Sequence, residues 1–167
     1  MVDKSNFTSD EWKVLLESVM MAGIAVTAAE PSGLWGLLKE SFAGGSALVT
    51  AKMDPAANSL IKAVVTDLDT SEGRSAARDD LKQKLTGKKP AEIKAKCIET
   101  LQQVGALIDA KASGDAVAFK GWLRQISQHV AEAANEGGGI FGIGGVPVSE
   151  AEKPTLTEIS RALKLAA

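Results

Sequence analysis

The sequence has few cysteines, which cross-link small secreted proteins, and few of the aromatic residues that are common in β-sheets. It contains a single cysteine, Cys97, which excludes an intramolecular disulfide and fits a reducing compartment. Tyrosine is absent, and aromatic residues make up only 4% of the chain. Period-2 alternation of apolar and polar residues is missing, whereas alanine is abundant. This composition favours closely packed helices over sheets, which are enriched in β-branched and aromatic side chains.

Signals for export, membrane insertion and nucleic-acid binding are also missing. The first twelve residues, MVDKSNFTSDEW, lack the basic and apolar segments of a signal peptide. The longest apolar stretch, residues 19–29, is well short of the roughly 20 residues that span a membrane. The formal net charge is -2, and the basic residues are interleaved with acids instead of forming a stripe. We therefore expect a cytoplasmic protein that has no transmembrane segment and binds no nucleic acid.

Helical periodicity runs along most of the 167 residues. Thr8-x-x-Glu11 is a capping box that begins a first helix, which is apolar nearly all round in its C-terminal half and therefore central. Pro31 ends it. The pattern predicts further helices that begin near residues 32, 55, 72, 90 and 115, and a last helix that follows a single turn at 149–153. The fold class is all-α, an antiparallel bundle of about seven helices in one domain spanning 1–167.

The segment NEGGGIFGIGGVPVSEAEKP, residues 135–154, is rich in glycine and apolar residues. It follows a helix, not a strand, and its spacing matches neither a dinucleotide-binding fingerprint nor a P-loop. Flanking lysines or arginines that would strengthen contact with an anionic membrane are missing, so membrane-surface contact is a less favoured alternative. Loops of this length are often functional. We interpret 137–148 as a helix connection whose apolar side chains pack on the bundle or on a partner: Ile140, Phe141, Ile143, Val146 and Val148.

Residues suited to catalysis are scarce. His129 is the only histidine, which excludes a ferritin-like site with its two Glu-x-x-His motifs and leaves no second histidine for a serine triad. Cys97 lies on an apolar helical stripe between Ile93 and Leu101, where cysteine commonly acts as a small hydrophobic residue. A nucleophilic pair of Cys97 and His129 is the one specific enzymatic alternative, and it requires two predicted helices to align these side chains.

Carboxylate clusters leave a metal site open as another alternative. A group of glutamates around the glycine-rich segment could bind an ion: Glu136, Glu150 and Glu152. The stretch DLDTSEG, residues 67–73, resembles part of a calcium loop, but Ser71 and Gly73 depart from that motif. Helix capping by Asp69 and Ser71 explains this stretch more simply. No cofactor is predicted.

Two stretches near the C-terminus resemble parts of a known domain family. They are VAEAANEGGG at 130–139 and VSEAEKPTLTEISRALKL at 148–165, and residues 21–40 have a similar character. Together, over about a third of the chain, they resemble the TerB-like domains associated with tellurite resistance. The sequence departs from that family where Asn135-Glu136-Gly137 and Glu30-Pro31 replace the usual Asp-Gly. The resemblance implies an all-helical domain connected with stress or with membrane-associated complexes.

These observations favour a non-enzymatic helical protein that acts through protein-protein contact and forms a homo-oligomer. The grounds are the surplus of apolar residues, the apolar glycine-rich segment and the missing catalytic constellation. The first alternative is a helical bundle that binds a small ligand or a metal ion. The second is an enzyme that uses Cys97 as its nucleophile.

Overall fold

The computed structural model describes residues 1–28, 58–136, 150 and 152–166. Within these ranges the regular elements are all helical and no residue belongs to a β-strand, which confirms the all-α class for this part of the chain. In sequence order they are the 3-10 helix η1 (Lys4–Asn6) and the α-helices α1 (Ser9–Thr27), α4 (Ser59–Leu68), α5 (Ser71–Leu85), α6 (Pro90–Lys111), α7 (Ser113–Glu136) and α8 (Glu152–Ala162). The helix predicted near residue 32 lies outside the described residues.

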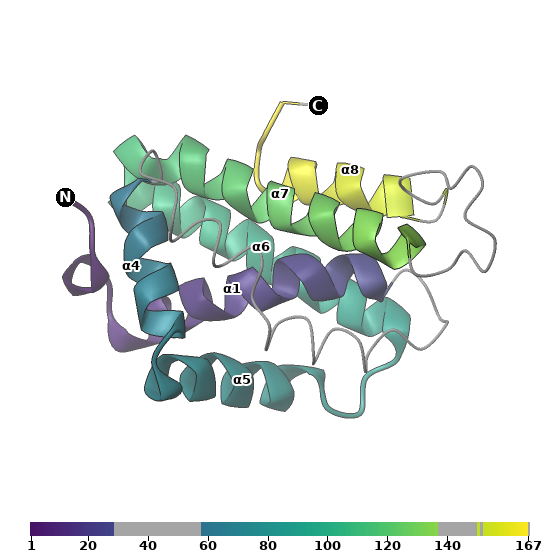
Figure 1. Ribbon diagram of the computed structural model, residues 1–167, viewed down its shortest axis with the longest axis horizontal. Coiled ribbons are helices and arrows are strands. Elements are labelled where there is room, and N and C mark those ends of the chain that lie inside the picture. Colours follow the sequence, from purple (N-terminus) through teal and green to yellow (C-terminus); the bar gives the residue numbers. More distant parts are fainter. Residues whose placement is uncertain (29–57, 137–149, 151, 167) are drawn as a thin grey trace.

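Helix α1 is central and contacts each of the other five α-helices described. Figure 1 shows α7 and α8 along one side of α1 and α5 along the opposite side, while α4 crosses the end near the N-terminus. Residues 21–26 of α1 are all buried, as the apolar sequence of this half of the helix predicts. The central helix therefore joins the two sides of the molecule.

Local capping signals place the start of two helices correctly. In the capping box of α1, Thr8 Oγ1 accepts the Glu11 amide at 3.2 Å and Glu11 Oε2 accepts the Thr8 amide at 2.7 Å. Pro90 is the first residue of α6, where its missing N–H costs no intrahelical hydrogen bond. Both starts confirm the prediction from the sequence.

Helix α4 begins later than predicted. The predicted start near residue 55 lies outside the described residues, but Asn58 has an extended backbone, so the helix starts at Ser59. The Asn58 side chain caps this helix by accepting the Ile61 amide at 2.9 Å. The predicted continuous helix from 55 is therefore wrong, because a second capping residue follows the Asp54-Pro55 signal.

Helix α5 is capped by a residue that differs from the predicted ones. Thr70 Oγ1 accepts the Gly73 amide at 2.9 Å, and the same hydroxyl donates to the Asp67 carbonyl oxygen at 2.6 Å. Capping by Asp69 or Ser71 is wrong, because Asp69 ends α4 and Ser71 is already the first helical residue. The stretch 67–73 is nevertheless a boundary between two helices, as predicted.

Helix α8 begins at Glu152, so the predicted start at Thr155 after a separate turn is wrong. Pro154 is the third residue of the helix. At this position a proline removes no intrahelical hydrogen bond, since the first four amides have no acceptor within the helix. Thr155 is consequently a buried residue inside the first turns and not a cap.

The buried apolar residues of all six described α-helices form one continuous core cluster. The predicted stripe of α6 lies entirely in this core: Ile93, Cys97, Leu101, Val104 and Ile108. Among the described residues, no helix is both long and apolar enough to cross a membrane.

Candidate functional site

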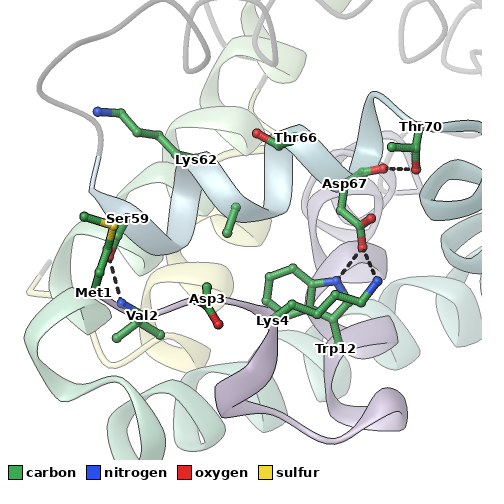
Figure 2. Close-up of a pocket in the computed structure, with 11 residues that line it drawn as sticks. Met1, Val2, Asp3, Lys4, Trp12, Ser59, Lys62, Thr66, Asp67 and Thr70 are labelled. Atoms are coloured by element: carbon green, nitrogen blue, oxygen red, sulfur yellow. Dashed lines mark hydrogen bonds and ion pairs between the residues drawn. The ribbon is translucent and has the colours of Figure 1, made fainter.

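A surface hollow of about 430 Å³ lies between the N-terminal segment and α4. Figure 2 shows Met1 and Val2 beside Ser59 at one end of the hollow, and Lys4 and Trp12 beside Asp67 at the other. Ala63 of α4 also lines it. The lining therefore combines apolar side chains, such as Met1, Val2 and Ala63, with polar groups at both ends.

Asp67 organises one end of the hollow. Its Oδ2 accepts a hydrogen bond from Trp12 Nε1 at 2.6 Å and another from Lys4 Nζ at 3.0 Å. The Phe7 ring packs on the Trp12 ring with centroids 5.7 Å apart, so the N-terminal segment is also held by an apolar contact. This carboxylate belongs to the calcium-like stretch of the sequence, and in the structure it accepts hydrogen bonds from an indole and an ammonium group.

A chain of hydrogen bonds fixes the other end. The Val2 amide donates to Ser59 Oγ at 3.2 Å, and that hydroxyl donates to Asp115 Oδ2 at 3.2 Å. The Asn58 side-chain amide donates to the Asp115 carbonyl oxygen at 3.0 Å. These hydrogen bonds connect the N-terminal segment, α4 and α7. The walls of the hollow are therefore held in place within the folded chain.

A second polar feature lies inside the helical packing. Glu17 of α1 is fully buried, and it is the only charged residue in the largely apolar stretch 14–27 of the sequence. Lys84 Nζ of α5 donates to Glu17 Oε2 at 2.8 Å and forms an ion pair with Asp80 Oδ2 at 3.0 Å. Two carboxyl groups from two helices therefore share one ammonium group.

Burial and the neighbouring carboxylate change the acidity of this group. The pKa of Glu17 is raised to about 7, first by burial and then by its hydrogen bond with Asp80, while Lys84 acts in the opposite direction. The same hydrogen bond lowers the pKa of Asp80. Glu17 Oε1 accepts no hydrogen bond from any described residue. The arrangement thus suits a Glu17 that carries a proton and an Asp80 that is ionised.

Cys97 of α6 lies in the core near this group. It is fully buried, and its pKa is raised to about 12 by burial and, to a smaller extent, by the negative charge of Glu17. His129, in contrast, is exposed on α7. A neutral thiol inside the core and an exposed imidazole do not have the geometry of a nucleophile with its base.

The glutamates predicted to bind a metal have different environments. Glu150 is exposed and pairs with Lys153, whereas Glu152 is fully buried at the start of α8. Glu136 is the last residue of α7, and its side chain is not among those described. In the described ranges, no group of three or more His, Cys, Asp or Glu side chains could hold a metal ion. The metal site stays a prediction.

The predicted interaction loop falls outside the described residues: Ile140, Phe141, Ile143, Val146 and Val148. Its place in the sequence is between α7, which ends at Glu136, and α8, which begins at Glu152. The contact role of these side chains therefore stays a prediction.

Sequence reasoning missed both polar features that the structure brings together. A signal for Glu17 was present, because a single carboxylate stands in the run between Leu16 and Val19 of an otherwise apolar helix face. No local signal marks the hydrogen bond between Trp12 and Asp67, which are 55 residues apart. Partners so distant in sequence become visible only when the fold is known.

Comparison with known proteins adds no functional assignment: no protein-family model, no curated protein and no solved structure matches this chain.

Proposed function

We propose that this chain is a non-enzymatic helical protein that acts through contact with other protein molecules, including copies of itself. The observation that carries the proposal is a set of four ion pairs that join the described helices to each other. Glu17–Lys84 joins α1 to α5, Glu11–Lys111 joins α1 to α6, Lys94–Glu158 joins α6 to α8 and Lys120–Asp109 joins α6 to α7. These pairs hold the helices together, and Cys97 is buried in the core, which supports the proposal of a non-enzymatic role.

The contact surface we propose is the apolar segment between α7 and α8. Its five large apolar residues are those of the interaction loop named above, and charged residues stand on both sides of it in the sequence. The resemblance to TerB-like domains supports a role in stress. We also propose that the complete chain is an antiparallel bundle of about seven helices and works in the cytoplasm.

Light scattering on the purified chain at high micromolar concentration tests the oligomer. We expect a mass above that of the 17.4 kDa monomer. Replacement of Phe141 and Ile143 together by aspartate should return the protein to a monomer, since charged groups are depleted at the cores of such interfaces. Val117→Asp is the matched control, because Val117 is a large apolar residue of α7 that is 78% exposed. A strictly monomeric wild-type chain would contradict the oligomer.

A small-ligand protein is the second candidate, and the hollow beside Trp12 is the observation that favours it. Its volume of about 430 Å³ is within the range of small-molecule sites. Thermal-shift screening against apolar fragments and divalent metals would detect a ligand. Ala63→Arg should fill the hollow and abolish such binding. Failure of every fragment and metal to raise the melting temperature would contradict this candidate.

A further inference from the structure

Glu17 and Glu152 are the two charged residues of the described helices whose side chains are fully buried, and Glu17 is paired with partners that are partly exposed. The Glu17 side chain has no exposed surface, whereas those of Asp80 and Lys84 are 30% and 27% exposed. Burying a charge is costly unless it is paired and hydrogen-bonded. One ammonium group cannot neutralise two carboxylates, and Glu17 Oε1 has no hydrogen-bond donor among the described residues. The buried group is therefore balanced only when it carries a proton.

Both partners of Glu17 come from α5, which has little apolar surface to hold it in place. Only three of its fifteen residues are buried, namely Gly73, Ala77 and Leu85. In Figure 1 this helix lies at the outside of the molecule, along α1. Ala77, Leu85 and the partly buried Leu81 are its apolar contacts with the core, so the polar contact with Glu17 adds to a limited apolar attachment of α5.

We propose that Glu17, together with Asp80 and Lys84, is a buried proton-binding site that controls how firmly α5 is attached to α1. The proposal does not depend on the proposed function, because it concerns only packing within one chain. In the protonated state the Glu17 hydroxyl donates to the Asp80 carboxylate and the other oxygen accepts from Lys84. The three groups then have no net charge. When Glu17 ionises, the same space holds two negative charges and one positive charge.

The charged and titratable groups around Glu17 determine whether it favours its protonated or its ionised form. The charged groups that act on Glu17 are Asp80 and Lys84 of α5. From α6, Cys97 faces the site, and its own pKa is raised by burial and then by the charge of Glu17. Lys13 of α1 acts on Asp80 from the protein surface. Lys84 is therefore the ammonium group that faces the buried carboxyl directly, and it is already shared with Asp80.

The pH range over which α5 detaches follows from the pKa of Glu17 when α5 is attached and when it is detached. The attached state holds the proton with a pKa of about 7, and an exposed glutamate has the ordinary value of 4.5. Because the pKa is raised by attachment, the site stabilises the attached state most at pH below 4.5. This contribution falls as the pH rises through 7 and is lost above it. Detachment of α5 should increase by about 30-fold from about pH 5.5 to about pH 8.5.

Amide hydrogen exchange of the α5 peptides, corrected for the intrinsic pH dependence of exchange, measures this detachment in the full chain. We expect α5 protection to fall over that pH range while α6 protection changes less. Glu17→Gln should keep α5 protected at both pH values, since the neutral amide donates to Asp80 and accepts from Lys84 as the acid does. A Glu17→Gln variant that keeps the wild-type pH dependence, or one that loses protection at high pH, would overturn the proposal.

Two further variants move the midpoint of the transition in opposite directions. Asp80→Asn removes the neighbouring negative charge and should lower the midpoint, whereas Lys84→Met removes the stabilising ammonium group and should raise it. Asp79→Asn is the matched control, because the adjacent Asp79 is exposed. A merely structural role would destabilise α5 in both variants without shifting the midpoint. Midpoints that stay fixed, or that move in the same direction, would therefore overturn the proton-binding site.

Discussion

A Cβ atom at Gly73 would lie 2.0 Å from the backbone carbonyl oxygen of Asp67. The carbonyl group cannot move away easily, because its oxygen also accepts hydrogen bonds from the amide and the hydroxyl of Thr70. The sharp connection between α4 and α5 therefore depends on a residue without a side chain.

Gly73→Ala should consequently destabilise the protein, even though alanine is the better helix former. Overpacking costs about 1–3 kcal/mol and occasionally more, and a contact this close to backbone belongs at the upper end, above the roughly 1 kcal/mol gained in helix propensity. Urea unfolding followed by circular dichroism measures the difference. Gly121→Ala is the control, because a Cβ there meets no atom within 4 Å. It should stabilise the chain, and equal effects of the two substitutions would contradict this account.

The hydrogen bond between Trp12 and Asp67 should contribute more to the free energy of unfolding than the ion pair of Lys4 with the same carboxylate. Asp67→Ala leaves the indole N–H of a tryptophan that is only 3% exposed without its acceptor, at a cost of about 2 kcal/mol. Lys4→Ala should cost less than about 0.5 kcal/mol, since the Lys4 side chain is 64% exposed. Urea unfolding compares the two variants, and a larger effect of Lys4→Ala would disprove this ranking.

The local part of the fold is predictable from the sequence, and the long-range part is not. The capping box of Thr8 and Glu11 and the apolar stripe of α6 were correct because neighbouring residues determine them. The start of α4 was missed because two capping signals, Asp54 and Asn58, stand four residues apart and periodicity does not choose between them. The burial of Glu17 depends on Lys84, a partner 67 residues away, and no spacing rule identifies such a pair.

Cys97 should be inert in the folded protein. A thiol that is fully buried and has a pKa of about 12 holds its proton at neutral pH, and only the thiolate reacts with a disulfide reagent. Labelling by an aromatic disulfide at about pH 8 should therefore follow the unfolding rate and become fast in denaturant. Rapid labelling of the native chain would show an accessible thiolate and would reopen the enzymatic alternative.

Lys120 and Asp109 form an ion pair whose two partners differ in burial. The Lys120 side chain is 7% exposed and that of Asp109 is 39% exposed, so the two partners lose different amounts of hydration when they pair. Asp109→Ala leaves a buried ammonium group without its carboxylate and should cost about 3 kcal/mol. Lys120→Met keeps the aliphatic stem in the core and leaves a carboxylate that water can reach, so it should cost less than about 1 kcal/mol.

The double variant should be close to Lys120→Met in its free energy of unfolding, because the penalty of Asp109→Ala arises from the unpaired charge. Urea unfolding of the three variants measures this, and a double variant whose loss equals the sum of the single losses would show that the two side chains do not interact.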